Sequence, residues 1–325
     1  MSLPAWLVWL LTLAVVGLFV YAADRYGKRV PIKRQPLYNR LLAIGFPLLL
    51  LVAWELLVNW GYLNGRWFPP PTRIGAALWD LIVSFDRFNK TSLLGRPWLI
   101  PSVLPEQGWR GAWGLIAESH VLATLFRVAL GFVIGAAPGV LVGMAMGLNK
   151  TIRQMLDPIM SAIYVLPKIA IFPLMMLIFA NPFGEGPKVA VIAITAFFLI
   201  AINTMAGVRG IEPVYLEAGR NFGAGRWQML RHVIVPAALP IIFSGLRIAL
   251  GSALIVIVAV EFIRAQQGVG YLVFYYWQVL AIDKMYASLF VVMLLGVGLT
   301  WLLQWIDFLL LQFLFLFLHL SVKIY

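Results

Sequence analysis

Cysteine is absent from this chain of 325 residues, and acidic residues are scarce. Without cysteine the chain forms no disulfides and offers no thiolate ligands to a metal. Only 12% of the residues are charged while 62% are hydrophobic, a composition that excludes an ordinary soluble domain and indicates a membrane protein. The formal charge is +12. Because the basic residues crowd short loops beside apolar runs, we interpret them as loops at the anionic cytoplasmic face and not as a nucleic-acid site.

Catalytic arrangements are missing as well. The phosphate-binding pattern GxxxxGK[ST] does not occur, so we expect no nucleotide site of that type in this chain. The three histidines, His120, His232 and His319, lie far apart in the sequence, and we expect no metal site. An integral membrane enzyme would need paired carboxylates or histidines at an interface, and these are not found. We therefore expect neither catalytic residues nor a cofactor bound by this chain.

Seven apolar runs are each long enough to cross a hydrocarbon core of about 30 Å. They cover residues 3–23, 41–60, 121–148, 158–180, 189–208, 239–263 and 286–318. Basic residues follow the first run and none precedes it, so we expect a retained anchor whose amino end lies outside. An odd number of spans then places the carboxyl terminus in the cytoplasm. The predicted fold class is an all-α polytopic membrane protein with about seven transmembrane helices.

The runs suggest three parts. Residues 1–40 form an extra anchor and a basic cytoplasmic loop, residues 41–120 form the second span and an extracytoplasmic connection, and residues 121–320 form the core. Three prolines at 69–71 enforce an extended segment, after which apolar residues at helical spacing predict a short interfacial helix. In the third run, closely spaced small residues predict close packing against a neighbouring helix. Its glycines are Gly131, Gly135, Gly139, Gly143 and Gly147.

A polar, basic stretch separates the fifth and sixth runs. Glu212 and Pro213 are typical of a helix start, because an acid is favoured at the positive end of the helix dipole and proline loses no hydrogen bond there. A short helix over about 212–222 follows, with an apolar stripe that includes Tyr215 and Phe222. Gly223 ends it, and a second short helix begins near Trp227. We call residues 212–230 the polar hairpin, and its shape suits the docking of a partner.

This hairpin resembles the EAA loop of bacterial ABC importer permeases. The matching residues are Glu217, Ala218, Gly219, Gly223, Ile234, Pro236 and Pro240. Gly219 stands where that pattern has alanine, which is a departure that weakens the helix. Further matches place the chain near the permeases that serve nitrate, sulfonate, taurine, bicarbonate and some vitamin-precursor importers. They are Trp54-Glu55, Pro167-Lys168-Ile169-Ala170, Gly245-Leu246-Arg247, Ala259-Val260-Glu261 and Gly268-Val269-Gly270-Tyr271-Leu272.

The resemblance implies a type I importer permease in a bacterial inner membrane. It implies an ATP-binding cassette ATPase dimer that carries ATP and Mg²⁺, a second permease copy, an extracytoplasmic substrate-binding protein and surrounding lipid as partners. It also implies that the polar hairpin couples the chain to the ATPase. The coupling residues would be Tyr215, Glu217, Ala218, Gly219, Phe222 and Gly223. A secondary transporter is the rival interpretation, but it would be expected to show inverted repeats, and none is evident.

Charges inside the spans are costly unless they are paired or face water, so each is a candidate site. For Arg127, Glu55 and Glu261, near the predicted outer ends, snorkelling to the interface is the simpler interpretation. Lys168 and Arg247 lie deeper, and a structural ion pair or a contact with the polar hairpin is as reasonable for them as a substrate role. The candidates for a translocation path are Lys168, Arg247, Glu261, Tyr164 and Phe172.

The cargo inference depends on these charges. Lys168 and Arg247 are not matched by equally deep acids, apart from Asp307, which favours a small oxyanion such as a sulfonate, nitrate or bicarbonate. The alternative cargo is a neutral heteroaromatic vitamin precursor, which would stack on Tyr164, Phe172 or Phe197.

Overall fold

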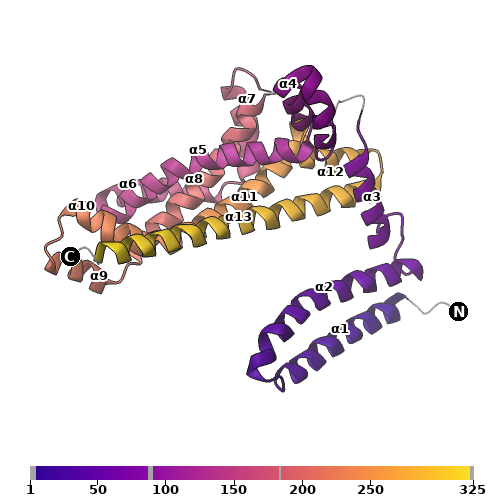
Figure 1. The fold of residues 1–325 in the computed structure, drawn as a ribbon, viewed down its shortest axis with the longest axis horizontal. Helices are drawn as coiled ribbons and strands as arrows, with labels where there is room; N and C mark the ends of the chain where they lie inside the picture. The colour runs from indigo at the N-terminus through magenta and orange to yellow at the C-terminus, as the bar shows by residue number, and fades with distance from the viewer. Residues whose placement is uncertain (1–4, 87–90, 183, 323–325) are drawn as a thin grey trace. The chain divides into compact units, whose positions relative to one another are not determined.

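The computed structural model describes residues 5–86, 91–182 and 184–322, and these are mostly helical (Figure 1). Within these ranges the only β-structure is a pair of isolated bridges. The chain divides into two compact units. The first contains residues up to 81 together with Tyr276–Ala287, and the second contains Ile82–Tyr275 and the chain from residue 288 onward. The all-α prediction is confirmed.

The first unit pairs two long helices, α1 (Ala5–Gly27) and α2 (Gln35–Asn59), joined through a short 3₁₀ turn, Ile32–Arg34. The hydroxyl of Tyr38 donates to the carbonyl of Ala23 at 2.5 Å, which fixes the start of α2 beside the end of α1. The predicted interfacial helix is α3 (Pro71–Val83). Residues 3 and 4 of the predicted first run lie outside the described residues.

Glu55 fixes the start of α3. Its carboxylate accepts hydrogen bonds from the backbone N–H of Thr72 at 3.0 Å and from the Thr72 hydroxyl at 2.8 Å. The next residue, Arg73, forms an ion pair of 2.7 Å with Asp283, at the beginning of α13 (Ile282–Val322). Glu55 therefore satisfies a first-turn donor of α3, which has no partner within the helix.

In the second unit, α5 (His120–Leu148) and α8 (Glu185–Arg209) lie side by side along their length (Figure 1). The glycines of α5 fall every four residues and face α8. A Cβ on Gly143 would lie 2.5 Å from the carbonyl oxygen of Ala201, and one on Gly131 would lie 2.6 Å from Cβ of Ile192. The predicted close packing of the third run is confirmed, because only glycine lets the two backbones approach this closely.

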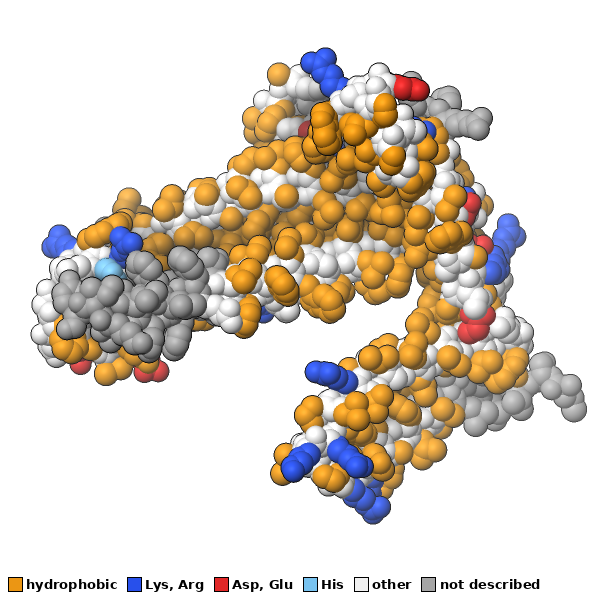
Figure 2. Space-filling model, in the orientation of Figure 1, with side chains coloured by type: hydrophobic (Ala, Val, Ile, Leu, Met, Phe, Trp, Pro, Cys, Tyr) orange, Lys and Arg blue, Asp and Glu red, His pale blue; other side chains and the backbone are white. Residues whose placement is uncertain are grey.

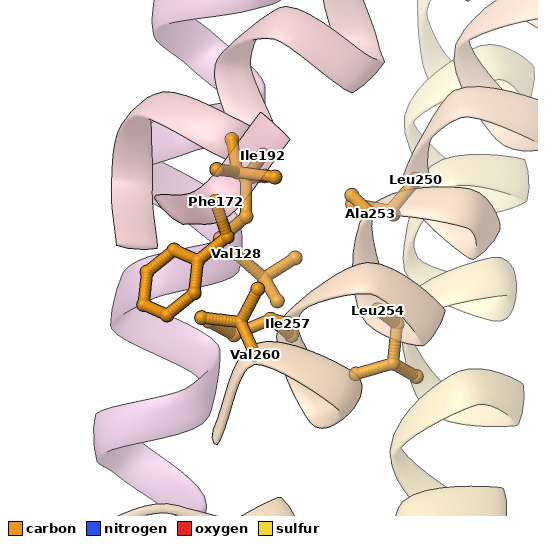
Figure 3. Packing of buried hydrophobic residues seen from close by; sticks show 9 residues of the cluster. Val128, Phe172, Ile192, Leu250, Ala253, Leu254, Ile257 and Val260 are labelled. Carbon is orange, nitrogen blue, oxygen red and sulfur yellow. The ribbon is translucent and has the colours of Figure 1, made fainter. Parts of the chain in front are cut away.

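The third long helix of this unit is α11 (Val235–Arg264), which packs on α8 and α5. Figure 3 shows where they meet: Val128 of α5, Ile192 of α8 and Ile257 of α11 point toward one another beside Phe172. Leucines of α13 pack on the outside of this cluster, including Leu295 and Leu299. The helices are held by a continuous apolar core.

The predicted fourth span is broken. Helix α6 (Lys150–Val165) begins earlier than predicted and stops before Pro167, after which a 3₁₀ turn (Lys168–Ile171) leads into the short α7 (Phe172–Ile178). The two helical parts are bent by 97°. Pro167 accounts for the break, because proline excludes the preceding residue from the helical region, and Leu166 is extended with ψ of 135°.

The remaining helices connect these long ones. Helices α9 (Pro213–Asn221) and α10 (Arg226–Met229) form the polar hairpin, and a π-helical turn, Leu230–Ile234, joins it to α11. The sequence did not lead us to predict α4 (Ile100–Ala117), which follows a 3₁₀ turn at Pro97–Leu99 and is kinked at Gly108, nor α12 (Val269–Gln278).

Five helical segments among the described residues are long and apolar enough to cross a membrane, and the bent pair makes a sixth if it counts as one span. The sequence predicted seven membrane spans. Helix α1, which lies at the position of the predicted first span, is not among these five or six segments. Figure 2 shows hydrophobic side chains covering the flanks of the long helices, with Lys and Arg at their ends. This distribution is that of helices whose sides face lipid.

Candidate functional site

The polar hairpin is built around a left-handed residue. Helix α9 starts at Pro213 after the extended Glu212, and Phe222 follows its last turn. Gly223 has φ of +75° and its N–H donates to the carbonyl of Arg220 at 2.9 Å. A Cβ on Gly223 would meet nothing within 4 Å, so glycine is required here by the backbone conformation and not by crowding.

Packing explains why position 219 is glycine and not the alanine of the EAA pattern. A Cβ at this position would lie 2.9 Å from the end of the Met229 side chain and 3.2 Å from Val233. The missing methyl group lets α9 lie directly on the chain that returns to α11. On that return, the side chain of Gln228 accepts from the N–H of Gly225 at 2.8 Å and so caps α10. Glycine at position 219 lowers the helix propensity of α9, and the close contact of α9 with Met229 and Val233 offsets this loss.

The outer surface of the hairpin is apolar and exposed. Phe222 is 90% exposed, Tyr215 is 57% exposed, and Glu217 lies on the exposed surface beside them. A pocket of about 750 Å³ lies between the hairpin and the end of α5. Its lining consists of Leu148, Arg220, Ala224, Arg226, Trp227, Met229, Leu230 and Ile234. Large exposed aromatic side chains next to a pocket are typical of a surface that binds a partner.

A second polar site lies at the opposite end of α8. This helix has 25 residues, so its two ends are about 36 Å apart. At the far end, Arg127 of α5 reaches the carboxylate of Glu261 on α11 at 2.7 Å and the carbonyl oxygen of Gln267 at 2.6 Å. The Glu261 side chain is fully buried, and that of Arg127 is 4% exposed. A buried pair of this kind is tolerated when hydrogen bonds satisfy its remaining donors and acceptors.

Three consecutive backbone amides complete this network. The N–H of Gly268 donates to Nδ1 of His120 at 3.0 Å, that of Val269 to the Thr124 hydroxyl at 2.9 Å, and that of Gly270 to Glu261 at 2.9 Å. These amides belong to the turn that starts α12, which has no helical partners for them. Buried side chains of α5 and α11 thus satisfy the first turn of α12.

Arg127 and Glu261 therefore do not snorkel, and that interpretation is wrong. Snorkelling requires a path to the interface, whereas these side chains are enclosed and neutralise each other. Arg127 also donates from Nε and Nη2 to the carboxylate of Glu185, with the Nη2 bond at 2.9 Å, and Lys188 reaches the same carboxylate at 3.0 Å. The structure brings together charges that the sequence places on three separate helices.

The two cations that the sequence marks as deep both have partners within the chain. The ammonium of Lys168 donates to the carbonyls of Ile163, Tyr164 and Leu166, at 3.1, 2.5 and 3.0 Å, where α6 ends. The break deprives the last carbonyls of α6 of their helical N–H partners, although that of Ile163 also accepts from the N–H of Leu166 at 3.2 Å. Among the described residues Lys168 has no acidic partner, as predicted, and backbone carbonyl dipoles stabilise its charge instead.

Arg247 lies 3.7 Å from Asp307 across α11 and α13. In the described part of the chain, Nε of Arg247 and Oδ1 of Asp307 are buried and make no hydrogen bond. Of the aromatic candidates, Tyr164 is half exposed, whereas Phe172 is enclosed in the core of Figure 3. The structure thus places Tyr164 and Lys168 together at the broken helix and pairs Arg247 with Asp307.

Sequence analysis missed Glu185, Lys188, Thr124 and Gln267. Lys188 lies one residue before the predicted fifth span and Glu185 lies in the preceding predicted loop, so neither was counted among the charges inside spans. The available signal was the spacing of Glu185 and Lys188, since an acid three residues before a lysine faces it on a helix. Helix α8 in fact begins at Glu185, which puts both residues in its first turn.

Comparison with known proteins identifies the family. Residues 139–312 match the family described as binding-protein-dependent transport system inner membrane component. The taurine transport system permease protein TauC of Escherichia coli is 31% identical over 81% of this chain and 86% of its own length. The putative aliphatic sulfonates transport permease protein SsuC of Bacillus subtilis is 28% identical over 80% and 82%. The nitrate import permease protein NrtB of Synechococcus elongatus is 29% identical over 71% and 84%.

The three relatives cover most of both chains, and the family match at residues 139–312 includes the polar hairpin. The chain therefore belongs to the binding-protein-dependent transport system inner membrane components, as a multi-pass permease subunit of an ABC importer in which ATP hydrolysis is carried by separate ATPase subunits.

Proposed function

We propose that this permease imports a small oxyanion, such as a sulfonate, nitrate or bicarbonate, which an extracytoplasmic binding protein delivers. The observation that carries the proposal is the agreement among the relatives, whose names refer to taurine, aliphatic sulfonates and nitrate. Each of these cargoes carries an oxyanion group. The charges of Lys168 and Arg247 do not support the oxyanion proposal, because both side chains have partners within the chain.

A neutral heteroaromatic cargo is less well supported. It would need exposed rings for stacking, but Phe172 is enclosed in the core and Phe197 packs edge-on against Phe198 at 5.0 Å between ring centroids. Of the three rings proposed for stacking, Tyr164 is the one on the surface, and the Lys168 ammonium lies 5.3 Å from its ring centre. A cation beside the ring favours an anionic or polar cargo over a neutral one.

Uptake into proteoliposomes tests the cargo. The permease and its ATPase are reconstituted into sealed vesicles loaded with ATP, and the binding protein is added outside. Uptake of radiolabelled taurine, nitrate, bicarbonate and a neutral thiazole or pyrimidine is then compared. We expect ATP-dependent uptake of an anion. Uptake of the neutral heterocycle with no response to any of the anions would overturn the oxyanion assignment and leave the family assignment intact.

We further propose that the polar hairpin docks into a groove of the ATPase, which binds ATP with Mg²⁺, while this chain binds neither. Tyr215, Glu217 and Phe222 would contact the ATPase, and Ala218, Gly219 and Gly223 would shape the hairpin that presents them. The exposure of Phe222 supports this, since a side chain that apolar is rarely left 90% exposed without a partner. Co-purification tests it: Phe222→Ala should weaken retention of the ATPase, whereas Trp79→Ala, which removes a similarly exposed aromatic residue from α3, should not.

The orientation and the assembly are also proposals. We place the amino terminus outside, the carboxyl terminus and both the 24–40 and 208–233 segments in the cytoplasm, and a second copy of this chain beside the first, within membrane lipid. Because the chain has no cysteine, single cysteines can be probed with an impermeant thiol reagent. Arg66→Cys should react in intact cells, and Asn39→Cys and Arg226→Cys should not. Labelling of either of the last two would reverse the orientation.

For the translocation path we propose Lys168 and Tyr164, at the broken helix, and Arg247 as lining residues. Glu261 and Phe172 would shape the path from behind, because both are enclosed within the single chain. Broken helices at membrane depth are tolerated where they line a cavity or are buried in protein, which supports a path beside residues 166–171.

A further inference from the structure

The Glu185 carboxylate lies in a cradle of three cationic donors. Arg127 holds both of its oxygens through Nε and Nη2, and Lys188 holds Oε1 at 3.0 Å. The side chains of Arg127 and Lys188 are 4% and 5% exposed, whereas that of Glu185 is 51% exposed. The donor groups of Arg127 and Lys188 are thus buried, whereas the Glu185 carboxylate that binds them is half exposed.

The opposite edge of Arg127 keeps the cradle in place. Its Nη1 is used by Glu261 and by the carbonyl of Gln267, and Glu261 is held in turn by Thr124 and by the N–H of Gly270. Gly268 and Gly270 leave no room for a Cβ beside this carboxylate, so the packing around it is tight. Departure of Glu185 would therefore leave Arg127 with its guanidinium oriented and one bidentate edge free.

This free edge would face an existing pocket. A cavity of about 650 Å³ is lined by Arg127, Glu185 and Lys188 together with Ile263, Ala265, Gln266 and Gln267. Its volume is in the range of small-molecule sites. The paired N–H groups on one edge of a guanidinium match two oxygens of a carboxylate, sulfonate or nitrate, and a lysine adds a charge-assisted third donor.

We propose that this cradle is a binding site for a small oxyanion, and that the Glu185 carboxylate is a tethered occupant which the oxyanion displaces. The proposal deepens the proposed function and rests on it for the identity of the cargo. In the exchange, the anion takes the Nε and Nη2 edge of Arg127 and the Lys188 ammonium, and Glu185 turns into water. The buried charge balance is unchanged, because one anion replaces another on the same two cations.

The tether explains how such a site could release its ligand. A carboxylate on the same chain competes at a high effective concentration, so the free anion binds weakly although its donors are buried. Weak occupancy suits a step on a transport route, where binding must be followed by departure. The site lies at the end of α8 opposite the polar hairpin, which by the proposed orientation is the side where the binding protein delivers cargo.

Binding of methanesulfonate to the intact importer tests the proposal. Permease and ATPase are placed together in lipid nanodiscs without binding protein, and methanesulfonate is titrated calorimetrically at constant ionic strength, with chloride as the balancing anion. Glu185→Gln removes the tethered charge and should tighten methanesulfonate binding by at least about tenfold. Adding Lys188→Met to that variant should abolish the gain.

A matched control lies elsewhere in the same unit. Arg96 also holds a glutamate, Glu118, through Nε and Nη2, at 2.8 Å each, but no lysine of the described residues pairs with Glu118. Glu118→Gln should leave methanesulfonate affinity unchanged. The proposal is overturned if Glu185→Gln gives no gain or if Glu118→Gln gives an equal one.

Two further arms keep the result decisive. If Glu185→Gln fails to assemble, as judged by gel filtration and ATPase retention, Lys188→Met in the wild-type background replaces it and should lower the residual affinity, with no change counting against the cradle. Failure of the proposed function is seen separately, as uptake of a neutral heterocycle but of no anion. That outcome changes the cargo without altering whether the cradle binds methanesulfonate.

Discussion

At its C-terminal end, α8 leads into a hairpin that exposes Phe222 and Tyr215 to solvent, whereas at its N-terminal end the charges of Arg127 and Glu261 are buried and matched within the chain. Exposed apolar surface is satisfied by another molecule, while a complete hydrogen-bonded network needs none. The comparison separates a surface that depends on a partner from a site that holds this chain together. Variants at the two ends should accordingly differ in whether they change stability or coupling.

The largest effect on stability should come from Arg127→Met. Removing this guanidinium leaves the Glu261 carboxylate buried without a counter-charge, which should lower the free energy of unfolding by about 3–5 kcal/mol. Thermal and denaturant unfolding of the purified permease in detergent measure the loss. The double variant Arg127→Met/Glu261→Gln should recover part of it, because the stranded charge is gone.

Arg96→Met is the control for burial. Arg96 has the same side-on contact with Glu118, and this hydrogen bonding raises the pKa of Arg96 above its ordinary value, but the pair is 20–25% exposed. Its loss should cost about 1 kcal/mol or less. Equal losses at Arg96 and Arg127 would show that burial does not distinguish the two pairs.

A smaller loss of stability is expected from a substitution between the two ends of α8, where this helix packs against α5. Gly143→Leu places a side chain where a Cβ alone would lie 2.5 Å from the Ala201 carbonyl, so the helices must separate at a cost of about 1–3 kcal/mol. Gly251→Leu, on α11 where a Cβ would meet nothing within 4 Å, should be neutral. If the two variants unfold alike, the glycines do not set the spacing of the helices.

The cation at the broken helix should have a still smaller effect. Lys168→Met removes the donor to three carbonyls at the end of α6, which should cost about 1 kcal/mol of stability. Because Lys168 is proposed to line the path, substrate flux in proteoliposomes should fall by more than it does in Glu55→Gln, whose carboxylate caps α3. A greater loss of flux in Glu55→Gln would remove Lys168 from the path.

Local signals in the sequence predicted the parts of the fold that depend on neighbouring residues. Hydropathy located the long helices, Glu212 and Pro213 marked the start of α9, and Gly223 marked its end. The glycines of α5 revealed its contact with α8 because their spacing is a property of one helix. Most of the helices and the outline of the polar hairpin could therefore be predicted.

The charged network around Arg127 could not be predicted from the sequence, because its contacts join residues that are far apart in the chain. Arg127 and Glu261 are 134 positions apart, and nothing local indicates that each is the other's partner. The partners of Lys168 were not predicted either, because the carbonyls that bind it become available only when Pro167 breaks the helix. The sequence shows which charges lie inside spans, but their partners depend on tertiary packing.

A small effect on stability should accompany a large effect on transport at Gly223. Its φ of +75° forces an L-residue into the left-handed region, which costs about 1 kcal/mol and turns α9 away from its proposed groove on the ATPase. In Gly223→Asp, uptake and substrate-stimulated ATP hydrolysis should fall, while membrane insertion and the unfolding temperature of the permease stay close to wild type. Gly225→Asp is the matched control, because Gly225 has φ of −66° and caps α10, where aspartate is favoured. Both variants add the same charge to the same hairpin, so a loss confined to position 223 assigns the effect to backbone conformation. Equal activity of the two variants would mean that the angle of α9 does not control coupling.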